Sequence, residues 1–183
     1  EAAASTALGV LYEREKNYKE ASVQFLRGLK NFETTANSEG VISEYKNLAR
    51  ISEAQKDHAS ALEYYKKAYA KSAADSNPAK QAELNNKIAE ELLHAGKDTE
   101  ALPYLQNALP FYQRKNSKKD IAVILRNIGI VHYKTGKYEE ALDFFKRSTE
   151  VDKKLPALRL IRDTYLKLFA THRVKSDPSK AAY

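Results

Sequence analysis

The side chains best suited to catalysis or metal binding are scattered along this 183-residue chain. Its four histidines, at positions 58, 94, 132 and 172, are far apart, and no two have the i, i+4 spacing of a helical metal site. The sequence contains no cysteine, which excludes thiol catalysis, disulfides and cysteine-ligated metal centres. The carboxylates are spread along the chain, usually near a lysine, as on a solvated surface. We therefore expect no metal, no cofactor and no enzymatic activity.

Two glycine–lysine pairs could be mistaken for phosphate-binding loops. They are Gly96-Lys97 and Gly136-Lys137, each followed by polar residues. A P-loop also requires a glycine five residues upstream and a serine or threonine directly after the lysine, and both pairs lack these residues. We interpret both pairs as turns between helices.

The elements that must carry these side chains repeat every 40 residues. Alanine recurs at this spacing, at Ala21, Ala61, Ala101, Ala141 and Ala181. A bulky apolar residue follows four positions later, at Phe25, Tyr65, Leu105 and Phe145. A small residue stands a further three positions on, at Gly28, Ala68, Ala108 and Ser148. Another small residue precedes each of the first four alanines by twelve positions, at Gly9, Ala49, Ala89 and Gly129.

Apolar residues within each unit recur at helical spacing, on two faces separated by a short polar turn. Leu8, Leu11 and Tyr12 form one such face, and Ala21 and Phe25 belong to the next. Each unit is therefore predicted to be a helix, a tight turn and a second helix. Strand alternation is absent, so we expect one all-α array over residues 1–183. Its units are residues 2–41, 42–81, 82–121 and 122–161, with a partial fifth at 162–183.

These residues resemble the tetratricopeptide repeat. The signature is an aliphatic–small pair with an aromatic three residues later, as in Leu8-Gly9 and Tyr12, followed by Ala21 and Phe25 in the second helix. The 40-residue period, in place of 34, resembles a class found in cell-polarity scaffolds, bacterial peptide-pheromone receptors and bacterial sensor proteins. The resemblance implies a right-handed α-α superhelix of antiparallel helix pairs, with both helices lengthened. Pro110 is expected to kink its helix or end it early.

The resemblance also implies that ligands contact the exposed side of the first helix of each unit, which lines a concave groove. The expected peptide-binding residues are Lys46, Asn47, Arg50, Asn86, Lys87, Arg126, Asn127, Tyr133, Lys134 and Lys167. Asn47 and Asn127 stand directly before an aliphatic–small pair, where related proteins use asparagine to hold a peptide backbone. Arg126, Lys134 and Lys167 make the C-terminal part of this groove basic, which favours an acidic or carboxylate-bearing ligand.

The net charge of +7 is unevenly distributed. Residues 1–100 hold 14 basic and 16 acidic side chains, whereas residues 101–183 hold 17 and 8. A nucleic-acid interface is one interpretation of the basic half, but acidic residues are interspersed there and no aromatic–basic stacking platform is evident. We therefore expect a protein or peptide partner and no nucleic acid.

The sequence thus predicts a non-catalytic peptide-binding module. The alternative is a sensory or regulatory input region of a larger bacterial signalling protein, either a two-component sensor kinase or a transcription regulator. The array lacks a polar cap after its last unit, which leads us to expect further chain in a parent protein. No targeting or transmembrane segment is evident, and the composition suits the cytoplasm and the bacterial periplasm alike. The ligand and the oligomeric state do not follow from the sequence.

Overall fold

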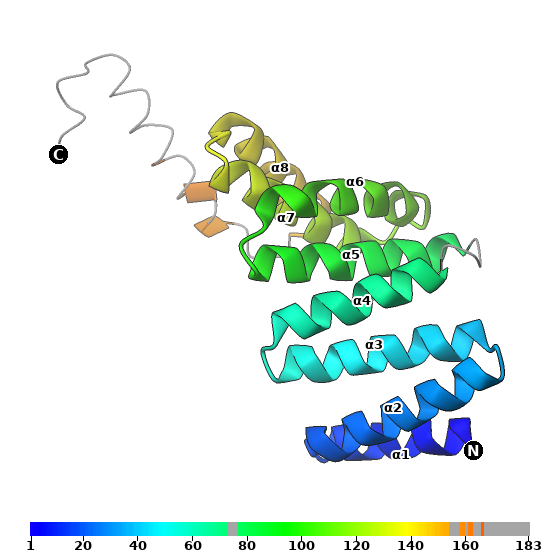
Figure 1. Cartoon of the computed structure of the whole chain (residues 1–183). Coiled ribbons are helices and arrows are strands. Elements are labelled where there is room, and N and C mark those ends of the chain that lie inside the picture. The colour runs from blue at the N-terminus through cyan, green and yellow to red at the C-terminus, as the bar shows by residue number, and fades with distance from the viewer. Residues whose placement is uncertain (73–76, 154–157, 160, 163–165, 167–183) are drawn as a thin grey trace. The chain divides into compact units, whose positions relative to one another are not determined.

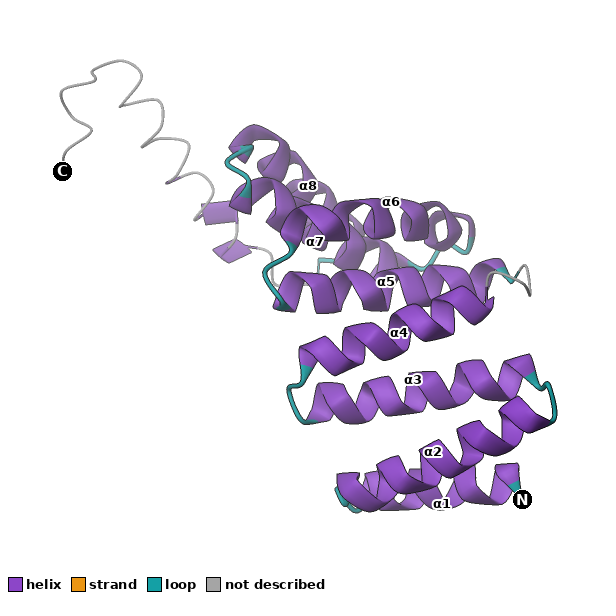
Figure 2. Cartoon of the chain, viewed as in Figure 1, coloured by secondary structure: helices purple, strands orange, loops and turns teal. Residues whose placement is uncertain are grey.

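The computed structural model describes residues 1–72, 77–153, 158–159, 161–162 and 166. The named elements of this part are eight α-helices, and no described residue lies in a strand (Figure 2). The helices are α1 (Ala2–Arg14), α2 (Tyr18–Thr34), α3 (Ser38–Ala54), α4 (His58–Ser72), α5 (Pro78–His94), α6 (Asp98–Arg114), α7 (Lys118–Lys134) and α8 (Tyr138–Val151). The predicted all-α fold of paired helices is confirmed.

The six helix-to-helix turns that the structure describes share one backbone feature, a residue with positive φ at a multiple of 20 positions from the others. These residues are Lys16, Ala36, Lys56, Gly96, Asn116 and Gly136. A left-handed residue just past the helix end turns the chain and lets the following N–H bond back to the last helical turn. In the first turn, the backbone N–H of Asn17 donates to the carbonyl of Tyr12 over 2.9 Å. The 40-residue unit is therefore two 20-residue halves, each holding a helix of up to 17 residues, which confirms the predicted lengthening.

The chain divides into two compact units, and the first spans residues 1–97. Within it, α1 to α4 each pack against the next helix in the chain, so that first and second helices alternate (Figure 1). At the start of α2, α3 and α5, a backbone N–H of the first turn donates to the side-chain oxygen of the preceding asparagine, which is Asn17, Asn37 or Asn77. Asparagine is well suited to this position because its short side chain satisfies a free N–H of the first turn.

The second unit begins at Asp98 and contains α6, α7 and α8. Here α6 packs on α7 and α7 on α8. Gly129 permits the closest approach, because a Cβ atom at this position would lie 2.6 Å from the Phe145 ring. The hydroxyl of Ser148 donates to the backbone carbonyl of Ala122 over 2.8 Å, which ties α8 to the first turns of α7.

The periodic small and bulky residues form the cores of both units. Of the 16 residues at these four positions of the first four repeats, every one is buried. The ring of Phe25 packs against Gly9 in the first unit, as that of Phe145 packs against Gly129 in the second. Helices can approach this closely only where the facing residue is small. The small and bulky residues therefore recur every 40 positions because each helix pair packs in the same way.

Of the two outcomes expected for Pro110, a kink or an early end of its helix, the early end is wrong. The helix continues past Pro110 to Arg114 instead of ending early. Proline removes one N–H and crowds the carbonyl four residues before it, that of Gln106. Both Gln106 and Pro110 are exposed, so water can bind the released carbonyl. The partial fifth repeat, residues 162–183, lies almost entirely outside the described residues.

Candidate functional site

The predicted groove cations of the first unit are all engaged in ion pairs between first helices. Lys46 of α3 lies 2.6 Å from Glu83 of α5. Arg50 of α3 pairs with Glu13 of α1 through two hydrogen bonds. These contacts connect successive repeats along the predicted ligand face. They also neutralise the positive charge that was expected to attract an acidic ligand in this unit.

Lys87 of α5 follows the same arrangement. Its ammonium lies 3.2 Å from Glu53 of α3 and 3.2 Å from Glu90 of its own helix. The neighbouring Asn86 donates its amide to Glu90 over 3.0 Å, while its Oδ1 is buried and has no hydrogen-bond partner in the described part of the chain. Lys87 therefore holds α5 against α3, and its charge is shared by two carboxylates.

Asn47 lies deeper than its predicted role at an exposed groove requires. It is 6% exposed, and its amide donates to the carboxylate of Glu44 over 3.1 Å. Glu44 is fully buried and also contacts the hydroxyl of Thr6 on α1. Burial raises the pKa of the Glu44 carboxyl, against the hydrogen bonds from Thr6 and Asn47, which lower it. Asn47 is thus part of a buried polar network between α1 and α3.

The second unit carries the remaining predicted residues on α7. Lys134 lies 2.7 Å from Asp98 at the start of α6, and Tyr133 packs edge-on against Tyr138 at a centroid distance of 5.6 Å. Asn127 is 5% exposed. Lys167, the last predicted groove residue, lies outside the described residues.

Arg126 differs from the other predicted groove cations that the structure describes, because no carboxylate within the described ranges pairs with it. Its Nε is buried and has no hydrogen-bond partner within the described part of the chain. A buried guanidinium N–H without a partner is unfavourable by about 1–3 kcal/mol or more, and an incoming acceptor removes this penalty. Arg126 is therefore the predicted site residue with the clearest capacity for a ligand.

A buried acid in α5 was not predicted from the sequence. Glu91 is 2% exposed and occupies the position held by Leu11, Ile51 and Val131 in the other repeats. Its carboxylate lies 2.8 Å from Nδ1 of His58, at the start of α4. Burial raises the pKa of the Glu91 carboxyl above its usual range, although the contact with His58 opposes the rise.

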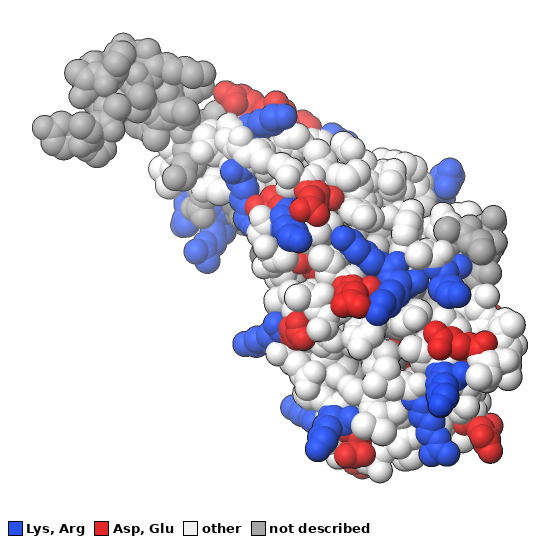
Figure 3. Space-filling model, in the orientation of Figure 1, with Lys and Arg blue, Asp and Glu red and all other residues white. Residues whose placement is uncertain are grey.

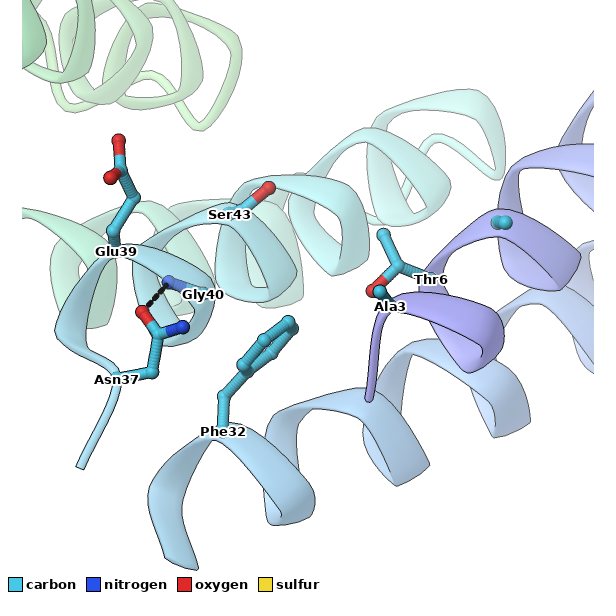
Figure 4. Close-up of a pocket in the computed structure, with 8 residues that line it drawn as sticks. Ala3, Thr6, Phe32, Asn37, Glu39, Gly40 and Ser43 are labelled. Atoms are coloured by element: carbon cyan, nitrogen blue, oxygen red, sulfur yellow. Dashed lines mark hydrogen bonds between the residues drawn. The ribbon is translucent and has the colours of Figure 1, made fainter. Parts of the chain in front are cut away.

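A cavity of about 420 Å³ opens between α1, the end of α2 and the start of α3 (Figure 4). Its lining residues are Ala3, Thr6, Ala7, Phe32, Asn37, Glu39, Gly40 and Ser43. Figure 4 places Asn37, Gly40 and Ser43 on one side, Ala3 and Thr6 on the other, and the Phe32 ring between them. Sequence reasoning missed this site because it sought polar residues at the groove positions, and here those positions hold alanines.

Among the residues that the structure describes, no group of three or more His, Asp or Glu side chains could hold a metal ion. None of the described helices combines the length and the apolar character that crossing a bilayer requires. On the face drawn in Figure 3, lysine and arginine side chains lie among aspartate and glutamate side chains. That face presents mixed charge instead of the continuous basic surface typical of nucleic-acid binding.

Comparison of the sequence with protein families gives one match, to the tetratricopeptide repeat family over residues 80–154. No curated protein sequence matches the chain. Among solved structures, BtubC (BKLC) from P. vanneervenii is similar, with a TM-score of 0.70 and 20% identity over 97% of this chain and 74% of that protein.

Two similar structures are much longer than this chain. One is a STAND signal-transduction ATPase with a tetratricopeptide repeat sensor, from Pyrococcus horikoshii, at a TM-score of 0.73 and 16% identity over 89% of this chain and 25% of that protein. The other is aspartyl phosphate phosphatase F from Bacillus subtilis, at a TM-score of 0.73 and 16% identity over 96% of this chain and 48% of that protein. At these identities the likeness concerns the fold.

The matched segment includes α7 and α8, and its helix pattern recurs at 40-residue intervals back to Gly9. The buried small residues, the bulky residues packed against them and the antiparallel pairs are the same in the part of the chain before the match. Residues 80–154 thus match the tetratricopeptide repeat family, and the helix pairs before them have the same fold.

Proposed function

We propose that this chain is a non-catalytic protein-binding module that takes an acidic or carboxylate-bearing peptide segment on the exposed sides of its first helices. Tetratricopeptide repeats are in general interaction scaffolds, and that broad role suits a chain with no recognisable catalytic constellation. The observation that carries the finer proposal is Arg126 on α7, whose buried Nε has no partner among the described residues.

The pairing of the other predicted groove cations makes Arg126 the best candidate for an anionic ligand. Lys46, Arg50, Lys87 and Lys134 already have carboxylate partners, so an acidic peptide would have to compete for them. Arg126 has no carboxylate partner among the described residues. A guanidinium binds carboxylates through several N–H groups in a fixed plane, which suits Arg126 to an acidic side chain or a C-terminal carboxylate.

Fluorescence anisotropy with two peptide pools tests this proposal. The first pool consists of fluorescein-labelled dodecamers with Asp or Glu at every third position and a free C-terminus. The matched pool has Asn or Gln at those positions and a C-terminal amide. We expect the acidic pool to bind more tightly, and the double variant Arg126→Ala, Asn127→Ala to weaken it at least tenfold, since charge-assisted hydrogen bonds contribute about 1.5–3 kcal/mol.

Arg147→Ala is the matched control, because Arg147 is an exposed arginine of α8 that pairs with Asp143 within its own helix. This variant should bind the acidic pool as the wild type does. Equal affinity for the two pools, or unchanged affinity in the double variant, contradicts the proposal. Tight oligonucleotide binding that falls steeply with log salt concentration would instead assign the basic residues to nucleic acid.

The second candidate function is a sensory or regulatory input region within a larger signalling protein. It is favoured by the similar structures of much longer proteins, one of which contains a tetratricopeptide repeat sensor. The coding sequence beside this chain tests it. An adjoining kinase or helix-turn-helix domain supports the regulatory role, and a stop codon directly after Tyr183 with no domain upstream contradicts it.

A further inference from the structure

The cavity between α1, α2 and α3 is a local departure from the repeat. The groove positions of α1 hold Ala3 and Ala7, whereas the residues 40 positions after Ala7 and 80 positions after it are Asn47 and Lys87. Small side chains at this end of the first unit leave a space of about 420 Å³ that the larger polar residues of the later repeats would occupy.

The floor of the cavity depends on a second feature found once in the described repeats. The Phe32 ring lies so close to Gly40 that a Cβ atom on this glycine would be 2.3 Å from the ring. Lys80 and Asp120 stand at the position of Gly40 in the next repeats, where no aromatic ring could lie as close to the helix. The Phe32–Gly40 contact therefore gives this cavity an aromatic floor.

The cavity also presents polar groups suited to a peptide backbone. The Oδ1 atom of Asn37 accepts the backbone N–H of Gly40 over 2.9 Å, which leaves the amide N–H₂ group as a donor. The hydroxyl of Ser43 forms no hydrogen bond with the described residues. Glu39 at the rim is paired with Lys80 at 2.7 Å, so the cavity itself offers no uncompensated charge. Apolar walls with a few polar groups are typical of ligand pockets, and this volume is at the small end of their range.

We infer that this cavity binds one bulky apolar side chain, of leucine to phenylalanine size, from the peptide segment that the module takes. The inference rests on the proposed peptide-binding function and extends it, since it gives the ligand an apolar residue in addition to an acidic one. The Phe32 ring and the alanine methyl groups contact the side chain, and Asn37 and Ser43 bond its flanking peptide groups.

Two-dimensional ¹H–¹⁵N NMR of the full chain tests the inference with N-acetyl-phenylalanine amide and N-acetyl-leucine amide as probes. We expect saturable shifts of the Gly40 and Ser43 amide signals in the millimolar range, and none with N-acetyl-glutamine amide. Ala7→Leu fills the cavity from an exposed position and should weaken the binding of both apolar probes at least tenfold. Ala4→Leu, on an exposed side of α1 away from this cavity, is the matched control and should leave the shifts unchanged.

Shifts that do not saturate, equal shifts with the glutamine probe, or full binding by Ala7→Leu would overturn the inference. Analytical ultracentrifugation tests whether a second copy of the chain occupies the cavity instead. A dimer that dissociates in the Ala7→Leu variant would assign the cavity to the dimer interface and overturn the inference. The probes are uncharged and need no contact with Arg126. Their failure therefore leaves the acidic-peptide result intact, and failure of the acidic pool leaves the cavity result intact.

Discussion

Replacing Glu91 by leucine should stabilise the first unit, although it removes an ion pair. The side chain of Glu91 is 3% exposed at a position where the other repeats hold leucine, isoleucine or valine. Burying a leucine side chain stabilises a fold by about 1.5–3 kcal/mol. The hydrogen bond lost to His58 is worth about 1.5–3 kcal/mol, but the desolvation penalty of the carboxylate, several kcal/mol, disappears with it.

The net expectation is a gain of about 1–3 kcal/mol at pH 7.5. His58 keeps a third of its side chain exposed, so water can solvate the ring once its partner is gone. Glu53 adds to the gain, since its carboxylate disfavours the ionised form of Glu91. Each kcal/mol should raise the Tm by about 2–4 °C in a chain of this length.

The stability gained by Glu91→Leu should depend on pH, because the Glu91 carboxyl titrates and leucine does not. The fold raises the pKa of Glu91, so the protonated carboxyl stabilises the first unit at pH values below the usual carboxyl pKa. This contribution is lost as the pH rises through the raised pKa of the folded state. The advantage of Glu91→Leu should therefore be larger at pH 7.5 than at pH 5.

Hydrogen exchange measured by mass spectrometry on the full chain can assign the gain to α4 and α5. Peptides from these helices should exchange about tenfold more slowly for each 1.4 kcal/mol of stabilisation. Glu83→Leu is the matched control on the same helix. Because the Glu83 side chain is 47% exposed, this substitution should not stabilise the helix. A loss of more than about 1 kcal/mol in Glu91→Leu would refute the reasoning, since the pair would then contribute more than an apolar side chain.

Two further predictions concern small residues and buried acids. Gly129→Ala should destabilise the second unit by about 1–3 kcal/mol in urea unfolding, because the new methyl group meets the Phe145 ring, and wild-type stability would contradict this. Gly136→Asn is its control, since this turn residue has a φ of +78° and open space around it, and asparagine tolerates that conformation. Glu44→Gln should raise the free energy of unfolding by about 1 kcal/mol at pH 7.5 and by less at pH 4, because burial raises the pKa of Glu44. Plots of unfolding free energy against pH that run parallel for the variant and the wild type would contradict this.

Much of the fold follows from the sequence because its determinants repeat. Ala21 and Phe25 recur at a fixed spacing, and the packing of one helix pair requires a small residue opposite a large one in every unit. The turns were harder to predict, since Lys16, Ala36 and Lys56 adopt positive φ without being glycine. Their conformation is imposed by the helices on both sides, which local preference does not reveal.

The candidate site was predicted less well, because it depends on which side chains meet across helices. Arg50 and Lys46 were chosen for their exposed positions, but each has an acidic partner 37 residues away on a neighbouring first helix. A search for acids nearly one repeat away would have found these pairs. The only sequence feature that could have indicated the cavity is the pair of alanines at the groove positions of α1. Small residues occur both beside cavities and where two helices are in close contact, so they do not predict a cavity by themselves.

The Nε–H group of Arg126 is the atom group at which binding of an acidic ligand can be observed without an intermediate step. The ¹H–¹⁵N signal of the Arg126 Nε–H group can be assigned by its disappearance in Arg126→Lys and followed during titration with the acidic peptide pool. We expect a saturable shift and slower exchange of this proton with water, because the donor gains a carboxylate partner. A signal that stays unchanged while the acidic peptides bind elsewhere would contradict it.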